Sequence, residues 1–88
     1  MTIELFPDLP SPRCVEVTGA ERLRLVNRSG AYGQQPALVS VRFAGFAAKI
    51  RANQAVVFAE PFGDYLRPGT HSVEVSGAPG PVSLRLLR

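Results

Sequence analysis

One histidine and one cysteine, His71 and Cys14, are the side chains of this sequence best suited to catalysis or metal binding. A histidine that acts as a general base needs a second group to orient its ring. Ser72 cannot serve, because neighbouring side chains of a strand point to opposite faces, whereas Asp64 could reach the ring across the preceding turn. We expect instead that His71 lies at the mouth of the core and hydrogen-bonds to the backbone.

Cys14 has no neighbouring base that would generate the thiolate required of a nucleophile, so we predict that it is a small buried hydrophobic residue. The segment Gly30–Gly33, GAYG, lacks the lysine and the following helix of a phosphate-binding loop. The carboxylates show no paired spacing and are scattered along the chain: Glu4, Asp8, Glu16, Glu21, Glu60, Asp64 and Glu74. The sequence therefore predicts no enzyme, no cofactor, no bound metal and no small-molecule substrate.

The histidine belongs to an unusual segment, Pro61–Val75, which reads PFGDYLRPGTHSVEV. Pro68 and Gly69 suit the two central positions of a type II turn. Three residues before that turn are too apolar for an idle loop: Phe62, Tyr65 and Leu66. They either cap one end of the fold, which we favour, or project as an anchor of a protein interface. The candidate interface comprises Phe62, Tyr65, Leu66, Arg67 and, from the longest polar loop, Tyr32.

The elements that position these residues are strands, because apolar residues repeat with a period of two and glycine or proline interrupts them. Gln54–Ala59 is almost wholly apolar, which predicts a central strand covered on both faces. Gly77–Pro81 is expected to turn the chain. The expected strands are Thr2–Phe6, Cys14–Thr18, Glu21–Asn27, Ala37–Phe43, Phe46–Arg51, Gln54–Ala59, Thr70–Ser76 and Val82–Leu87. The residues expected to face the core include Leu23, Leu25, Val39, Val41, Phe43, Phe46, Ala48, Ile50, Val73, Val75, Val82, Leu84 and Leu86.

Seven to eight short antiparallel strands at this spacing predict an all-β, Greek-key sandwich. The 88 residues, 45% hydrophobic and 19% charged, form one domain over residues 1–88. Residues 1–13 are a proline-rich N-terminal strand or arm, suited to lie on a neighbouring molecule. So small a core needs further stabilisation, and a single cysteine excludes an internal disulfide. We therefore expect self-association or docking on a protein partner.

Nine of the ten basic residues are arginines, and the net charge is +3. Six cations fall on the polar side of their expected strands: Arg22, Arg24, Arg42, Lys49, Arg51 and Arg85. If several share one sheet, they form a basic face that could contact phosphates or an acidic protein. A solvated outer face is the simpler interpretation, and nucleic acid is the less favoured partner.

From Glu21 onward, the order of features resembles the cupredoxin-like and immunoglobulin-like β-sandwiches. ERLRLVNRSG is similar to the strand and Asn/Gly turn of a cupredoxin, AKIRANQAVVF to its polar turn and apolar strand, and YLRPGTHSVEV to the entry of its penultimate strand. A blue-copper site requires two imidazoles and a thiolate, but this sequence has one histidine, and its cysteine stands early where the family's ligand is late. The resemblance therefore implies the scaffold without copper.

These observations predict a non-enzymatic structural protein that docks on itself or on a larger complex, for example a decoration or tail protein of a bacteriophage particle. The alternative is a small binding module whose basic face contacts nucleic acid or an acidic protein. Met1–Arg13 has no export signal, and no apolar run is long enough to cross a membrane. We expect no membrane partner and a cytoplasmic location, or a virion if the chain leaves the cell within a particle.

Overall fold

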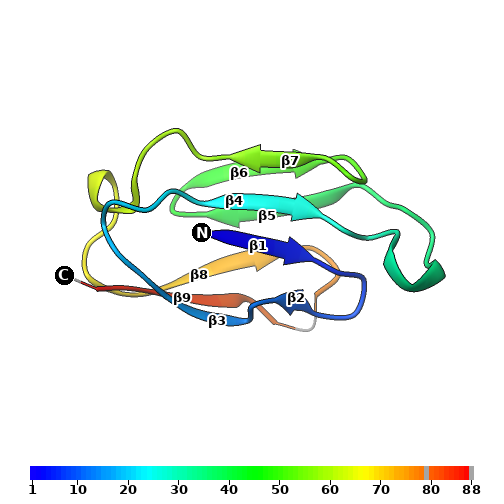
Figure 1. The fold of residues 1–88 in the computed structure, drawn as a ribbon, viewed down its shortest axis with the longest axis horizontal. Coiled ribbons are helices and arrows are strands. Elements are labelled where there is room, and N and C mark those ends of the chain that lie inside the picture. Colours follow the sequence, from blue (N-terminus) through cyan, green and yellow to red (C-terminus); the bar gives the residue numbers. More distant parts are fainter. Residues whose placement is uncertain (79, 88) are drawn as a thin grey trace.

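The computed structural model describes residues 1–78 and 80–87 and shows two β-sheets packed face to face (Figure 1). The expected turn at Gly77–Pro81 contains Pro79, which lies outside the described residues. The strands are β1 (Thr2–Leu5), β2 (Pro10–Ser11), β3 (Cys14–Val17), β4 (Arg24–Asn27), β5 (Val39–Phe43), β6 (Phe46–Ile50), β7 (Ala55–Val57), β8 (Gly69–Val75) and β9 (Val82–Leu86). Two short 3-10 helices complete the fold, η1 (Ala31–Gly33) and η2 (Phe62–Asp64).

The first sheet has the order β2-β1-β4-β7 and the second has the order β3-β9-β8-β5-β6. Both sheets are mixed, because β1 runs parallel to β4 and β3 runs parallel to β9. The all-β sandwich is thus confirmed, but the expectation of antiparallel strands throughout is wrong. The chain crosses to the second sheet at β3 and returns at β4, so β4 arrives beside β1 in the same direction. The proline-rich segment also adds a two-residue strand, β2.

Alternation along the strands places the core as expected. Val73, Val82 and Leu84 are fully buried between the sheets, while the intervening Glu74 and Arg85 are exposed. Burying each such aliphatic side chain contributes about 1.5–3 kcal/mol to folding. The core therefore follows directly from the period-two pattern of the sequence.

The expectation of a central strand at Gln54–Ala59 is wrong. The segment forms the short strand β7, which ends the order of the first sheet, and Val57 is 59% exposed. An apolar run marks a strand, but it does not distinguish a strand covered on both faces from an apolar edge strand that is left uncovered. This difference exposes apolar surface on one side of the sandwich.

The N-terminal segment is part of the sandwich. β1 lies between β2 and β4, and its Ile3 and Leu5 belong to the core. The terminal ammonium of Met1 donates a hydrogen bond to the carbonyl of Arg22 at 2.9 Å, and the amide of Arg24 donates to the carbonyl of Met1 at 2.8 Å. Of the strand or arm expected for residues 1–13, the structure has the strand: β1 pairs with β2 and with β4 of its own domain. None of the described helices is long and apolar enough to cross a membrane.

Candidate functional site

His71 is a structural residue in this fold. Its ring is half-buried, and Nε2 lies 2.8 Å from the carbonyl oxygen of Arg67. A carbonyl only accepts, so Nε2 carries the proton and donates it to the turn that precedes β8. The expected hydrogen bond from His71 to the backbone is confirmed.

Cys14 is exposed, so the prediction that it is buried is wrong. It pairs in register with Ser83 of β9, whereas its neighbour Val15 pairs with Leu84 of the core. Position 14 therefore has the outward phase of β3, which the inward phase of Val15 and Val17 already indicated. His71 pairs with Leu84 on the inward face, so the cysteine and the histidine lie on opposite faces of the second sheet.

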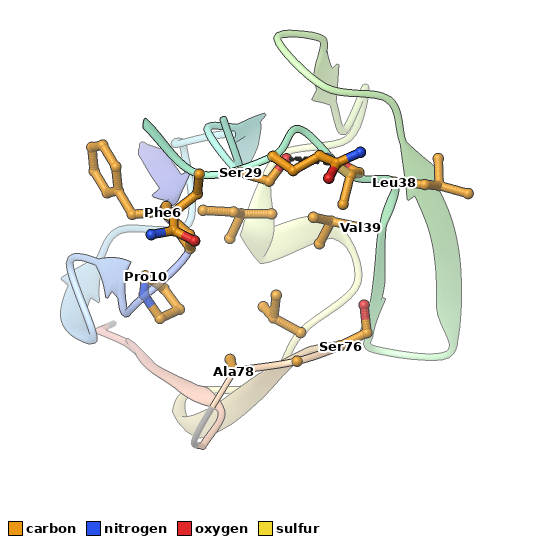
Figure 2. Close-up of a pocket in the computed structure, with 14 residues that line it drawn as sticks. Phe6, Pro10, Ser29, Leu38, Val39, Ser76 and Ala78 are labelled. Carbon is orange, nitrogen blue, oxygen red and sulfur yellow. Dashed lines mark hydrogen bonds between the residues drawn. The ribbon is translucent and has the colours of Figure 1, made fainter. Parts of the chain in front are cut away.

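A pocket of about 350 Å³ lies at the end of the sandwich where β1 meets β2 and β8 meets β9 (Figure 2). Its lining is mostly apolar and includes Phe6, Pro10, Leu38 and Val39. The two serines of the lining are already bonded to the backbone. The Ser29 hydroxyl donates to the carbonyl of Ala37 at 2.9 Å, and the Ser76 hydroxyl accepts from the amide of Ser40 at 3.0 Å. The Ser29 hydroxyl also accepts from the amide of Ala37 at 2.8 Å, so Ala37 holds it on both sides.

Tyr32 lies at this same end, on η1. Its ring stacks on Phe6 with centroids 5.7 Å apart, and it remains 71% exposed. The structure thus separates Tyr32 from the other four residues of the candidate interface, which surround η2 at the opposite end (Figure 1). The candidate interface is not one surface.

The apolar residues around η2 cap the sandwich. Phe62 is completely buried, and Tyr65 and Leu66 are half-buried against the core, while Arg67 is exposed. Phe62 as an interface residue is thus a correction: the capping alternative holds for it. The reason is local, because the amide of Phe62 donates to the carbonyl of Glu21 at 2.8 Å and so fixes η2 against the end of the sandwich.

Five aromatic rings connect this cap to the surface. The buried ring of Phe43 meets Phe58, Phe62 and Tyr65 at centroid distances of 5.9, 6.3 and 6.1 Å. Phe46 in turn meets both Phe58 and Tyr65 at 5.7 Å, and it is 50% exposed. The cluster thus begins in the core and ends at an aromatic ring in solvent. The expectation that Phe46 faces inward is correct in direction, because it pairs with the buried Phe43, but half of its surface is exposed.

The exposed end of this cluster opens into an apolar hollow of about 300 Å³, which we call the β6–β7 groove. It lies between the edge strands of the two sheets, along the side of the molecule where β6 and β7 run (Figure 1). Its lining is Phe46, Ala47, Ala48, Val56, Val57, Phe58, Ala59, Glu60 and Tyr65. The sequence analysis missed this surface, because it placed Gln54–Ala59 in the interior. The signal was present in the small side chains of β6, FAAKI, which cannot cover a neighbouring apolar strand.

The Tyr65 hydroxyl at the groove is buried and forms no hydrogen bond with any residue that the structure describes. Burial removes water from the phenol and raises its pKa above the ordinary value of 10.0. The phenol therefore ionises at a higher pH in the folded protein than in the unfolded chain.

Replacing Tyr65 with phenylalanine is expected to raise the free energy of unfolding by about 1 kcal/mol, because the unpartnered hydroxyl is removed. The raised pKa of Tyr65 also makes the stability of the wild type fall at alkaline pH. The phenol of the unfolded chain ionises at a pH of about 10, below the pKa of the folded form, so wild-type stability is retained below that pH and falls as the pH rises. Urea unfolding of both proteins at neutral and alkaline pH checks this. A Tyr65→Phe variant that is less stable than the wild type would contradict this prediction. So would a variant whose free energy of unfolding falls as steeply with rising pH as that of the wild type.

The six cations of the candidate basic face do not share one surface. Arg42, Lys49 and Arg85 lie on the second sheet and Arg24 lies on the first, with Arg22 preceding it and Arg51 following β6. The Arg22 Nε donates to the carbonyl of Ala59 at 2.8 Å.

Acidic residues accompany two of the three cations on the second sheet, whereas Lys49 pairs in register with Ser40. Arg85 lies 3.7 Å from the carboxylate of Glu16, and Arg42 pairs in register with Glu74. Nucleic-acid binding requires positive charge that is concentrated on one surface. On this sheet, acidic side chains lie among the basic ones instead.

Among solved structures, the chain matches a copper(I) structure of a methionine-to-alanine mutant of amicyanin, with a TM-score of 0.65 and 14% sequence identity. The match covers 99% of this chain and 81% of that chain. The fold is cupredoxin-like. The resemblance expected from the sequence is therefore confirmed for the cupredoxin-like scaffold, and at this identity the likeness concerns the fold alone. No protein-family model matches the sequence, and no curated protein matches it.

The side chains of this cupredoxin-like domain do not fit a blue-copper centre. Such a centre needs two imidazoles and a thiolate, and the sequence holds one histidine and one cysteine. These two lie on opposite faces of the second sheet, and the ring nitrogen of His71 is already bonded to a carbonyl. Within residues 1–78 and 80–87, no three His, Cys, Asp or Glu side chains gather as metal ligands. We derive no chemistry through copper.

Proposed function

We propose that this chain is a non-enzymatic assembly module that docks on a second copy of itself through the β6–β7 groove. The observation that carries the proposal is the exposure of Phe46 and Val57, which line the groove and are 50% and 59% exposed. Aromatic residues in apolar hollows provide most of the affinity of protein interfaces. A groove that joins the core through a continuous aromatic cluster is rigid enough to bind without a large loss of entropy.

The opposite side of the sandwich supports the choice of the groove. There the edge strands are β2 and β3. β2 begins with Pro10 and is followed by Pro12 and Arg13, and Glu16 is exposed on β3. Prolines, charges and very short strands prevent other chains from pairing with a sheet edge. The β6–β7 side has no proline from Phe46 to Glu60. The β2 edge, with two residues and a proline, is therefore better protected against pairing than the β6 edge, whose five residues include one charge, Lys49.

A second copy is the occupant that this surface fits best. Glu60 is the one charged residue among the nine that line the groove, so a second copy of the same surface covers it with little charge to bury. A domain of 88 residues also buries too little apolar area to be strongly stable by itself. Covering the groove adds that burial.

The assembly that the sequence analysis named, a bacteriophage particle with this chain as a decoration or tail component, remains a prediction. Self-association through one open side is consistent with such a role.

Replacing Phe46 with glutamate is expected to weaken self-association about tenfold or more, because a charge would have to be buried against the second copy. Sedimentation equilibrium from micromolar to millimolar concentration measures the change. Tyr32→Glu is the matched control, because Tyr32 is an exposed aromatic at the other end of the sandwich, and its association should equal that of the wild type.

The salt dependence separates this function from the alternative. Contacts to phosphate weaken steeply as salt is added, whereas association through an apolar groove does not. A wild-type protein that stays monomeric at millimolar concentration would overturn the proposal. So would a Phe46→Glu variant that associates as strongly as the wild type.

A further inference from the structure

We infer that the second copy joins this chain strand to strand, with β6 pairing antiparallel to β6 of the other copy around a two-fold axis at Ala48. The inference rests on the proposed self-association and specifies its geometry. It would extend the second sheet, β3-β9-β8-β5-β6, without interruption into that of the second copy. Three features of β6 carry the inference: the direction of its free backbone groups, its register, and the size of its side chains.

The backbone of β6 has free hydrogen-bonding groups at defined positions. β5 and β6 are joined by a two-residue turn, Ala44 and Gly45, with φ of 51° and 82°. This is the type I′ hairpin, whose flanking residues, here Phe43 and Phe46, form a hydrogen-bonded pair. Hydrogen-bonded and non-hydrogen-bonded pairs then alternate along the ladder. The backbone amides and carbonyls of Ala47 and Lys49 therefore point away from β5, toward the open edge.

A two-fold axis at Ala48 gives a hydrogen-bond partner to every free backbone amide and carbonyl of Ala47 and Lys49. It places Ala47 opposite Lys49 of the second copy, and Lys49 opposite Ala47 of the second copy, so both residues meet partners whose groups are also free. Because β6 has five residues, Phe46–Ile50, with Ala48 at its centre, this register pairs the whole strand. Moving the axis to Lys49 would place two lysines directly opposite each other, which destabilises a sheet. Moving it to Ala47 would shorten the paired segment.

The side chains of β6 are compatible with this close approach. Ala48 at the axis and its neighbour Ala47 are small, and so no bulky group separates the two backbones. Phe46 would lie opposite Ile50 of the second copy, on the inner face of the extended sheet. β7 is the weaker candidate for such pairing, because it contains three residues.

Disulfide cross-linking tests this register. Ala48→Cys is made in a Cys14→Ser background, which removes the exposed native thiol. The two Ala48 positions form a non-hydrogen-bonded pair with Cα atoms about 4.5 Å apart, within the range that a disulfide spans. We expect mild oxidation to convert the variant to a covalent dimer. Ala47→Cys in the same background is the matched control, because its two copies would be diagonal neighbours about 7–8 Å apart and should cross-link poorly.

The outcomes separate the inference from the proposed function. If the mass measurement shows a dimer, but Ala47→Cys cross-links as readily as Ala48→Cys, or neither cross-links, the register is wrong and the proposed function stands. If the wild type is monomeric, the proposed function fails. Hydrogen exchange of the wild type provides a second measurement. The amides of Ala47 and Lys49 should become protected as the protein concentration rises, and unchanged exchange in a proven dimer would overturn the inference.

Discussion

Replacing Asn27 with alanine is expected to lower the free energy of unfolding by about 4 kcal/mol, because several buried polar groups lose their partners at once. Asn27 is fully buried at the end of β4. Its Nδ2 donates to the carbonyls of Ala37 and Ile50 at 2.8 and 2.7 Å, and its Oδ1 accepts from the amide of Ser29 at 2.9 Å. One side chain thus connects β4, the long loop and the end of β6.

Alanine leaves the carbonyl of Ile50 and the amide of Ser29 without these side-chain partners in the interior. Each buried group left unpaired costs about 1–3 kcal/mol, and a domain of this size has about 4–13 kcal/mol of stability in total. The variant should therefore unfold at a much lower urea concentration. Gln34→Ala is the matched control, because Gln34 is an exposed amide in the same loop and its loss should change stability by less than about 0.5 kcal/mol. If both variants unfold together, Asn27 does not hold the loop.

The role of Asn27 illustrates what the sequence cannot show. As an asparagine at the end of an apolar strand and the start of a polar loop, it indicates a turn, and its burial depends on carbonyls 10 and 23 residues away. By contrast, the inward positions Val73, Val82 and Leu84 follow from alternation alone. Local periodicity predicts which face of a strand is apolar, and long-range contacts decide what covers that face.

The same distinction explains the candidate site. Phe46 and Val57 were expected in the interior, because their strands are apolar. Phe46 has the expected inward direction, because it pairs in register with the buried Phe43. Val57 pairs with the exposed Arg24 and therefore lies on the outer face of the first sheet. The sheet order, which places β6 and β7 at two edges, leaves the inward ring of Phe46 exposed. Strand order depends on how the chain crosses between the sheets, and the period of two does not encode it. The surface that carries the proposed function was therefore beyond prediction from alternation alone.

Replacing Phe62 with alanine is expected to lower the free energy of unfolding by about 3–5 kcal/mol, the usual cost of emptying a buried aromatic position. Its ring is fully buried and lies edge-on to Phe43, with centroids 6.3 Å apart. The surrounding backbone cannot easily collapse into the cavity. The amide of Gly63 donates to the carbonyl of Gly19 at 2.9 Å, and a Cβ built on Gly63 would lie 3.1 Å from backbone atoms of Gly19. The two backbone segments, at Gly19 and at Gly63, are already in close contact there.

Phe46→Ala is the matched control for this cavity. It removes a ring of the same size from the same aromatic cluster, but one that is 50% exposed, so the loss should be less than about half of that for Phe62. Thermal and urea unfolding of the two variants at a concentration where the protein is monomeric measure the difference. Equal losses of unfolding free energy in the two variants would mean that the exposed ring of Phe46 contributes as much to folding as the buried ring of Phe62. A larger loss for Phe62 together with weaker association for Phe46 would assign the two ends of one cluster to two tasks, folding in the core and docking at the groove.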